Sequence, residues 1–327
     1  MNHAERLRAL LEFRPVDRLP RIEWASWWDQ TVERWQAEGL PVSDRYAMYA
    51  YFGLDPYYQF WFGPRAATYP PAAHGQGLVA DAVDYERLLP HLYPPVDWVG
   101  EAMAPAAAMQ ERGEAVVWVT IEGFFWYPRT LLGIERHLYA FYDQPALVHR
   151  MNQDLVCHHL RVLDAVAKAA RPVFMTFAED MSYNHGPMIS KAQFDEFLAP
   201  YYRQVVPRLE ELDIVPFVDT DGDPAAMVAW LESVGVRGVL PLERQAGVDA
   251  SRLRAAHPRL LMIGHFDKMV MTRGREAMRA EFERLLPVMR SGGFVPSVDH
   301  QTPPGVSLEE YRVYLRLLEE YTRAAAQ

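Results

Sequence analysis

Five short apolar runs in the C-terminal half, each separated from the next by an amphipathic segment, constrain the fold more than any other feature. Each run is bounded by turn residues and is apolar at consecutive positions, which is typical of strands buried on both faces. The runs are PVFMTFAED (172–180), DIVPFVDTDGD (213–223), RGVLPLE (237–243), LLMIGHFDK (260–268) and GGFVPSVDH (292–300). Helical patterns cover 190–212, 223–235, 249–258 and 275–292. This alternation predicts parallel βαβ units.

The N-terminal half is less regular but completes a count of eight strands. We predict strands at 18–24 and 115–123, one more near 77–83, and a long helix over 144–170. Eight strands suit a TIM barrel, (β/α)8. An open doubly wound sheet is the main alternative, but no glycine-rich dinucleotide motif follows the first strand. We therefore predict that residues 1–327 form one α/β domain, a (β/α)8 TIM barrel with an N-terminal helical and loop elaboration.

Charge and cysteine content exclude several classes of protein. The formal net charge is −10, whereas a nucleic-acid partner calls for a basic face. Cys157 is the single cysteine, which excludes a disulfide framework and a thiolate zinc site. The N-terminal MNHAERLRALLEF is an amphipathic pattern without the continuous apolar core of a signal peptide. No run approaches the roughly 20 apolar residues of a membrane span, so we expect a cytoplasmic protein with no membrane partner.

Polar side chains follow nearly every predicted strand at its carboxyl end. In a barrel these ends meet at one mouth, where active sites form. So many carboxylates would repel one another unless a cation, a lysine or bound protons offset them. A single one could be a helix N-cap, and we assign Asp223 to capping. Together they predict a divalent metal site or acid–base chemistry. The residues are Glu23, Glu122, Glu179, Asp180, Asp219, Asp221, Glu243, Asp267, Lys268, Asp299 and His300.

The Asp219-Thr220-Asp221 sequence is the best candidate for a metal site. Spacing of i, i+2 at a strand end points both carboxylates the same way, and His300 could supply a third ligand and Glu179 a fourth. The alternative is that this segment only forms a turn. Such ligands suit zinc, manganese, iron or magnesium, and the sequence does not choose among them.

Other residues are candidates for contact with a substrate. Lys268, just past a buried strand, could bind an anionic group or pair with the carboxylates. His185 lies in a loop at the same end of the barrel, whereas His158 and His159 fall within a helix and are better explained as core or surface residues. Two aromatic stretches could line the bottom of a substrate pocket or pack beneath long loops. They are WASWWDQ (24–30), which contains Trp27, and DPYYQFWFG (55–63).

Several segments together resemble the uroporphyrinogen decarboxylase superfamily, which includes cobalamin-dependent methyltransferases. They are RPVDRLPRIEW, EDMSYNHGPMISKAQFDEFLAPYYRQV, VLPLE, IGHFDK and GGFVPSVDHQTPPGVSLEEYRVYLRLLEEY. The resemblance implies a (β/α)8 barrel with its site at the C-terminal mouth. The methyltransferase branch holds zinc through a His-x-Cys pair and a later Cys. Asp219-Thr220-Asp221 and His300 stand at these positions, so the usual ligand set is replaced by an oxygen-rich one.

The decarboxylase branch implies a different assignment of the same residues. It uses an N-terminal arginine motif to bind the many carboxylates of its substrate, an Asp-Ser pair and a histidine. Asp219-Thr220 and His300 match the last two, but RIEWASWWDQ offers only Arg21 before its tryptophans. An acidic rim without these arginines is a poor host for an octacarboxylate.

The sequence therefore predicts a metal-dependent methyltransferase that acts with a corrinoid partner protein on a small substrate. We expect catalytic roles for His300, Asp219 and Lys268, and a divalent metal, zinc first, held by Asp219, Asp221, His300 and Glu179. The predicted substrate-binding residues are Glu243, Thr220, Asp180, Trp27 and His185. Two alternatives stay open: a metal-independent decarboxylase, and a non-catalytic barrel that binds a tetrapyrrole or corrinoid. A homodimer is a further possible assembly.

Overall fold

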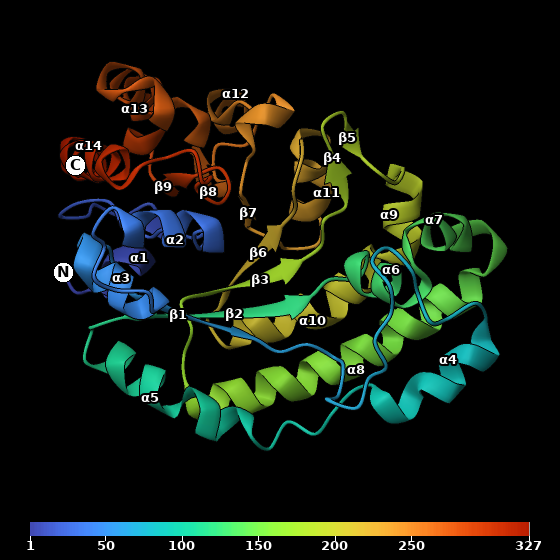
Figure 1. Ribbon diagram of the computed structural model, residues 1–327. Helices are drawn as coiled ribbons and strands as arrows, with labels where there is room; N and C mark the ends of the chain where they lie inside the picture. Colours follow the sequence, from blue (N-terminus) through green and yellow to red (C-terminus); the bar gives the residue numbers. More distant parts are fainter. Residues whose placement is uncertain (327) are drawn as a thin grey trace.

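The computed structural model describes residues 1–326, and its centre is a curled parallel sheet of seven strands (Figure 1). The strand order is β1-β2-β3-β6-β7-β8-β9, with every neighbouring pair parallel. The bounds are β1 Tyr57–Trp61, β2 Val116–Glu122, β3 Phe174–Ala178, β6 Val215–Asp219, β7 Gly238–Leu240, β8 Leu261–Phe266 and β9 Phe294–Val298. A short antiparallel hairpin, β4 Ser182–Tyr183 and β5 Gly186–Pro187, follows β3. The parallel α/β architecture is confirmed.

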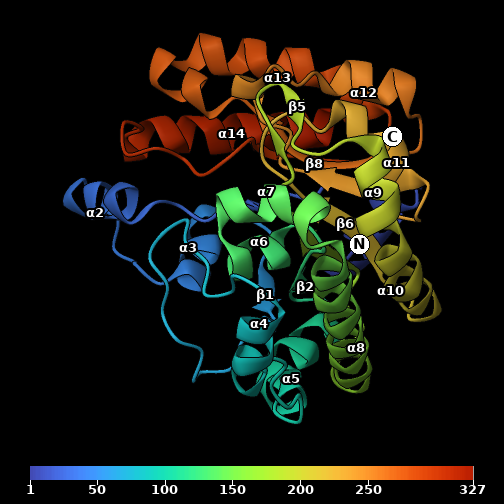
Figure 2. The same ribbon diagram turned by 90° about the vertical axis from the view of Figure 1, so that its right-hand side faces the viewer.

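Helices cover the outside of the sheet. Their bounds are α1 His3–Leu11, α2 Asp29–Ala37, α3 Arg45–Phe52, α4 Ala82–Leu88, α5 Val99–Glu111, α6 Trp126–Leu132, α7 Ile134–Asp143, α8 Pro145–Ala169, α9 Lys191–Phe197, α10 Ala199–Glu211, α11 Val228–Glu232, α12 Ala250–Ala256, α13 Arg275–Arg290 and α14 Leu308–Ala324. Short 3-10 turns lie at η1 Leu89–His91, η2 Ala225–Met227, η3 Arg244–Ala246 and η4 Lys268–Arg273. Helix α8 packs between α5 and α10, and α13 packs against α12 and α14 on the other side (Figure 2). No helix among the described residues is long and apolar enough to cross a membrane.

Six of the eight predicted strands are present, and two predictions are wrong. The five C-terminal runs contain β3, β6, β7, β8 and β9, and residues 115–123 contain β2. Residues 77–83 are instead an irregular turn that leads into α4. The missing strand is β1, inside the stretch interpreted as an aromatic loop. Its sequence YYQFW is only partly buried, because β1 lies at an edge of the sheet, and it lacks the apolar run that marks the other strands.

Residues 18–24 are extended but form no strand, so the described residues contain no eighth strand of the parallel sheet. The segment lies between the sheet edges β9 and β1. The indole Nε1 of Trp24 donates to the carbonyl of Val298 in β9 at 2.6 Å, and the hydroxyl of Tyr57 in β1 donates to the carbonyl of Trp24 at 2.8 Å. Side-chain hydrogen bonds thus connect this segment to β9 and β1, where a closed barrel would have backbone hydrogen bonds between strands. Pro20 lacks an amide hydrogen, and proline disfavours a central strand.

Helix boundaries follow local chemistry. Ser190 caps α9: its side chain accepts from the backbone amide of Gln193, and the backbone amide of Ser190 donates to the side chain of Gln193. The predicted helix 190–212 is interrupted at Leu198, ahead of Pro200, and continues as α10. The side chain of Asp223 accepts from the amide of Ala225, the first residue of η2, at 3.0 Å, although Pro224 is the residue that directly precedes this turn.

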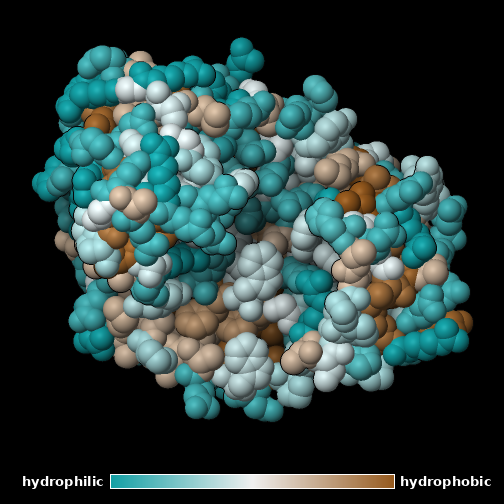
Figure 3. Space-filling view, viewed as in Figure 1, coloured by the Kyte–Doolittle hydropathy of each residue, from teal (hydrophilic) through white to brown (hydrophobic). Residues whose placement is uncertain are grey.

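The carboxyl ends of the strands share one side of the molecule with several connecting elements. Helices α6 and α7, the β4–β5 hairpin and α9 lie on this side, to the right in Figure 1 and facing the viewer in Figure 2. Apolar residues reach the surface there, where α7 lies (Figure 3), and this helix exposes Ile134, Leu138, Tyr139 and Tyr142.

Candidate functional site

A cavity of about 310 Å³ opens at the carboxyl ends of β1, β6 and β9. Three carboxylates and an imidazole come from the end of β6 and from the loops after β3, β6 and β9, and three indoles and one guanidinium come from the N-terminal half. The lining residues are Trp24, Ala25, Ser26, Arg45, Gln59, Trp61, Trp118, Asp180, Asp219, Asp221, His300 and Gln301. This cavity joins the strand ends that the sequence predicted to converge.

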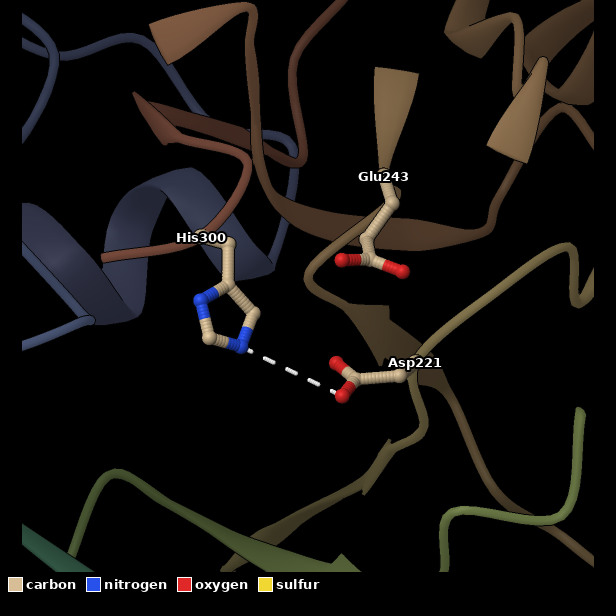
Figure 4. Close-up of side chains that lie close together, drawn as sticks. All are labelled: Asp221, Glu243 and His300. Atoms are coloured by element: carbon tan, nitrogen blue, oxygen red, sulfur yellow. Dashed lines mark ion pairs between the residues drawn. The ribbon is translucent and has the colours of Figure 1, made fainter. Parts of the chain in front are cut away.

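Asp221, Glu243 and His300 form a compact cluster at the cavity (Figure 4). One ligand atom from each residue lies within 4.8 Å of the other two, and each side chain is half-buried. The Nε2 of His300 lies 3.9 Å from the Oδ2 of Asp221. Asp221 and His300 were predicted as metal ligands, whereas Glu243 was predicted only as a substrate contact. The structure brings Glu243 into the same cluster because the loops after β6 and β7 are neighbours.

Backbone amides fix the carboxylate geometry around Asp221. The amide of Asp221 donates to the Oδ1 of Asp180 at 3.2 Å, and the amide of Gly222 donates to the Oε2 of Glu243 at 2.8 Å. Gly222 has φ of +82°, and a Cβ there would lie 2.5 Å from the Cα of Tyr183. Only glycine fits this turn without displacing the hairpin.

Glu243 is positioned by the loop between β7 and η3. The ring of buried His265 contacts the carbonyl of Leu242 through Nδ1 at 2.8 Å, while its Nε2 accepts from the amide of Ala250 at 3.0 Å. These bonds require a neutral ring protonated at Nδ1. Burial lowers the pKa of His265 to about 4, in agreement with a neutral ring. The ring therefore anchors the residue immediately before Glu243.

Asp299 joins three loops at the mouth. Its Oδ2 accepts from the amide of Arg244 at 3.0 Å, and its Oδ1 accepts from the Nζ of Lys268 at 3.1 Å. Lys268 also donates to the side chain of Gln245 at 2.9 Å and does not line the cavity. Asp299 thus places the following residue, His300, while Lys268 neutralises Asp299 at the edge of the site.

The carboxylates of the cavity repel one another, which disfavours their ionised forms and raises their pKa values. Burial, followed by repulsion from Asp180 and Glu243, raises the pKa of Asp221 to about 7. Burial and repulsion from Asp180 and Asp221 raise the pKa of Asp219 well above its usual range. Burial is also the main cause of the raised pKa of Asp180. Bound protons or a cation would relieve this strain.

His300 has a defined surrounding. The amide of Gln301 donates to its Nδ1 at 2.8 Å, so the proton of the neutral ring lies on Nε2. The ring stands edge-on to Trp24, with centroids 6.1 Å apart. Burial, followed by the charge of Lys268, lowers the pKa of His300. In this arrangement the protonated Nε2 faces Asp221, at 3.9 Å from its Oδ2.

Two residues predicted as parts of the site hold the fold instead. The carboxylate of Glu179 is fully buried and accepts from the amides of Phe124 (2.8 Å), Phe125 (2.7 Å) and Trp126 (3.1 Å) and from the hydroxyl of Tyr202. It therefore anchors the start of α6. Thr220 is buried and bonded to the amide of Met181 and the hydroxyl of Ser182.

Two further predicted contacts lie away from the cavity. Trp27 is buried among Trp35, Tyr49, Phe52 and Tyr311. His185 is exposed in the β4–β5 hairpin, edge-on to Tyr183. Asp219 does line the cavity, at the last position of β6, but it is not a member of the three-residue cluster.

Arg45, which was not predicted as a site residue, lies in α3 and lines the cavity. Its guanidinium donates to the hydroxyls of Tyr49 and Tyr57, which hold it against the wall. A helix in an N-terminal elaboration gives no strand-end signal, so nothing in the sequence pattern connected Arg45 to the site. Trp24 and Trp61 were within the aromatic stretches considered, but the pattern did not distinguish them from Trp27.

A protein-family comparison decides the classification. The family model described as uroporphyrinogen decarboxylase (URO-D) matches residues 78–321, more than half of the chain. The chain belongs to this family. A search of curated proteins found no match.

One solved structure supports the same fold. A methyltransferase from Methanosarcina mazei superposes with a TM-score of 0.68 at 15% identity, covering 98% of this chain and 99% of that one. A putative vitamin-B12-independent methionine synthase from Listeria monocytogenes gives a TM-score of 0.46 at 10% identity, covering 95% and 98%. At this identity, the likeness to the Methanosarcina protein shows a shared fold.

Proposed function

We propose that this protein is a metal-dependent methyltransferase in which Asp221, Glu243 and His300 hold a divalent cation. The observation that carries the proposal is the convergence of these three ligand atoms within 4.8 Å from the ends of three different strands. A metal bound there would act as a Lewis acid toward an oxygen, sulfur or nitrogen atom of the substrate.

The donor set fits a catalytic zinc site better than a structural one. Three protein ligands with imidazole and carboxylate donors leave a coordination position open for substrate, as in catalytic zinc sites. The charge of the site also favours a bound cation. Four carboxyl groups lie close together there, and the nearby Lys268 is already paired with Asp299. The four are Asp180, Asp219, Asp221 and Glu243. Binding through the Nε2 of His300 would move the proton of the neutral ring to Nδ1, which could then no longer accept from the amide of Gln301.

The cavity supports a small substrate. A volume of about 310 Å³ is at the lower end of small-molecule pockets. Three carboxylates and one guanidinium line it, so a polycarboxylate would be repelled. Arg45 is the one cation among the described residues that line it, and Trp24, Trp61 and Trp118 supply apolar walls. Methyl transfer to a corrinoid would need a partner protein at the mouth, and the exposed apolar residues of α7 offer contact area beside it.

The test measures methylation of cob(I)alamin by its absorbance, with protein purified without chelator. We expect turnover with a small methyl donor that is lost after treatment with a chelator and restored by Zn²⁺. The Glu243→Gln variant should lose it, and Asp223→Asn, which alters a cap outside the cluster, should retain it. Turnover that is indifferent to chelator and to Glu243→Gln would contradict the metal-dependent proposal.

A second candidate is a metal-independent carboxy-lyase, and the bond from Gln301 to His300 favours it. With Nδ1 already an acceptor, the Nε2 proton of His300 faces the cavity and could be delivered to a carbanion left by loss of CO2. Arg45 would hold the carboxylate of such a substrate. Product formation without metal, abolished by His300→Gln, would support this function over the first.

A further inference from the structure

We propose that a second cavity, beside the candidate site but separate from it, binds a small monocarboxylate that carries an apolar group. This cavity has a volume of about 330 Å³, at the lower end of small-molecule pockets, and no carboxylate of the described residues lines it. Its walls come from the loop between β1 and α4 and from α6, which lie side by side in Figure 1. Arg65, Tyr69 and Arg129 bring polar groups to the cavity, and prolines, alanines and an isoleucine bring apolar ones.

Arg129 supplies the positive charge of the second cavity. Its Cζ lies 5.1 Å from the centroid of the Trp126 ring, and its Nη1 donates to the backbone carbonyl of Asp180 at 3.3 Å. This is the one side-chain hydrogen bond that Arg129 makes with the described residues, and its acceptor is neutral, so the guanidinium forms no ion pair there. A guanidinium keeps its charge in proteins, and its planar set of N–H donors matches the two oxygens of a carboxylate.

Arg65 and Tyr69 limit the ligand to a single negative charge and add a donor for it. Arg65 is paired with the buried carboxylate of Glu122, and its Cζ lies 5.7 Å from the centroid of the Tyr69 ring. The hydroxyl of Tyr69 is buried and has no hydrogen-bond partner among the described residues. Such a group carries a free-energy cost that an acceptor on a ligand would remove. Because Arg65 is already paired, the unpaired charge of Arg129 matches a monoanion.

The loop that forms one wall is fixed against α6 and α7 by backbone contacts. The amide of Ile134, the first residue of α7, donates to the carbonyl of Gly75 at 3.1 Å. A Cβ at Gly77 would lie 2.1 Å from the backbone of Leu132 in α6, so glycine is required for this close approach. The wall is therefore formed without a ligand, and binding does not have to order the loop first.

The second cavity is a neighbour of the candidate site but shares no lining residue with it. The carbonyl that Arg129 binds belongs to Asp180, whose side chain lines the candidate site. The loop after β3 thus contacts both cavities. A carboxylate bound to Arg129 would occupy a place beside the candidate site, which suits a second ligand that binds together with the substrate. The inference does not depend on a metal at Asp221, Glu243 and His300.

Titration calorimetry with four small compounds tests the class of ligand. Benzamide has nearly the shape of benzoate without the charge, acetate has the charge without the ring, and phenyl phosphate has a second charge. We expect benzoate to bind at least about ten-fold more tightly than benzamide or acetate, a difference of about 1.4 kcal/mol. Equal or tighter binding of benzamide or acetate, tighter binding of phenyl phosphate, or no binding of benzoate would overturn the proposal.

Variants assign the binding to the second cavity. Arg129→Gln removes the unpaired charge and should weaken benzoate about ten-fold, while the affinity for benzamide stays nearly unchanged. The matched control is Arg150→Gln, because Arg150 in α8 is also partly exposed but does not line the cavity. Equal effects of these two variants on benzoate would contradict the inference.

Tyr69→Phe is a second variant that leaves the fold intact. It removes only a hydroxyl that has no partner among the described residues, so the free energy of unfolding in urea should not fall. The affinity for benzoate should fall about three-fold, because one donor to the carboxylate is lost. A purely structural role for Tyr69 predicts the reverse, with lower stability and unchanged affinity. Unchanged affinity in both Tyr69→Phe and Arg129→Gln would overturn the proposal.

Titrations with and without metal separate this inference from the proposed function, because carboxylates also bind metal ions. Benzoate should bind equally to protein loaded with Zn²⁺, to protein freed of metal by a chelator and then dialysed, and to the Glu243→Gln variant. Affinity that depends on Zn²⁺ or on Glu243 would place benzoate at the candidate site, which overturns this inference and leaves the metal site standing. Protein that holds no metal but binds benzoate through Arg129 refutes the metal-dependent function and keeps the second cavity.

Discussion

Replacement of Glu23 by glutamine should make the protein less sensitive to rising pH. Glu23 lies in the extended segment between β9 and β1, and its side chain is 1% exposed. The hydroxyls of Ser297 and Tyr311 donate to it at 2.6 and 2.9 Å. Burial outweighs these bonds and raises its pKa from 4.5 to about 7.

The sign of the effect follows from this rise. Because the folded protein holds the proton more tightly than the unfolded chain, the stability from Glu23 is fully present below pH 4.5. It is lost progressively as the pH rises toward 7. A rise of this size corresponds to about 3 kcal/mol in total, of which about 2 kcal/mol falls between pH 5.5 and 8. Glutamine carries no titrating proton, so Glu23→Gln removes this loss.

Urea denaturation of both proteins at pH 5.5, 6.5, 7.5 and 8 measures the effect. The free energy of unfolding of the variant, relative to the native protein, should rise by about 2 kcal/mol across this range. Glu33→Gln alters an exposed glutamate and should show a constant difference. A difference between Glu23→Gln and the native protein that does not change with pH would refute the reasoning.

Three further substitutions test how the loops of the mouth are held. Gly222→Ala should destabilise the protein by roughly 2 kcal/mol more than Gly247→Ala in urea denaturation. Both glycines have positive φ, but only a Cβ at Gly222 would lie 2.5 Å from Tyr183. Equal losses of stability in the two variants would contradict this close contact. Glu179→Gln should lower the free energy of unfolding by about 2 kcal/mol, because one carboxylate oxygen that accepts from backbone amides is replaced by an NH2 donor. The metal content of this variant should stay unchanged. Loss of metal would indicate that Glu179 is a ligand. Ser190→Ala should cost about 1 kcal/mol through loss of the cap of α9, and a cost near zero would show that the cap is dispensable.

The interior strands could be predicted from the sequence because burial on both faces leaves a continuous apolar run. All seven residues of β2 and all five of β9 are buried. The edge strand β1 has no such run, so the same rule overlooked it and placed strands at 18–24 and 77–83. The first of these segments does occupy the gap between the sheet edges, but it is tied there by the side chains of Trp24 and Tyr57.

The candidate site was predictable only in part, for a related reason. The position of a residue at a strand end predicts that it lies near the mouth, but not which way its side chain points. Asp221 and His300 point into the cluster, whereas Glu179 at a similar position turns toward the amides of α6. Glu243 joins the cluster because the amide of Gly222 holds its carboxylate, a contact between two loops that spacing along the chain does not reveal.

The metal content of protein purified without chelator tests the central claim most directly. Plasma mass spectrometry should find about one equivalent of a divalent transition metal in the native protein, with zinc expected first. The Asp221→Ala/Glu243→Ala double variant should lose the metal, while Asp223→Asn should keep it. Equal metal in the native protein and the double variant, or none in the native protein even after incubation with Zn²⁺, would contradict the assignment of Asp221, Glu243 and His300 as a metal site.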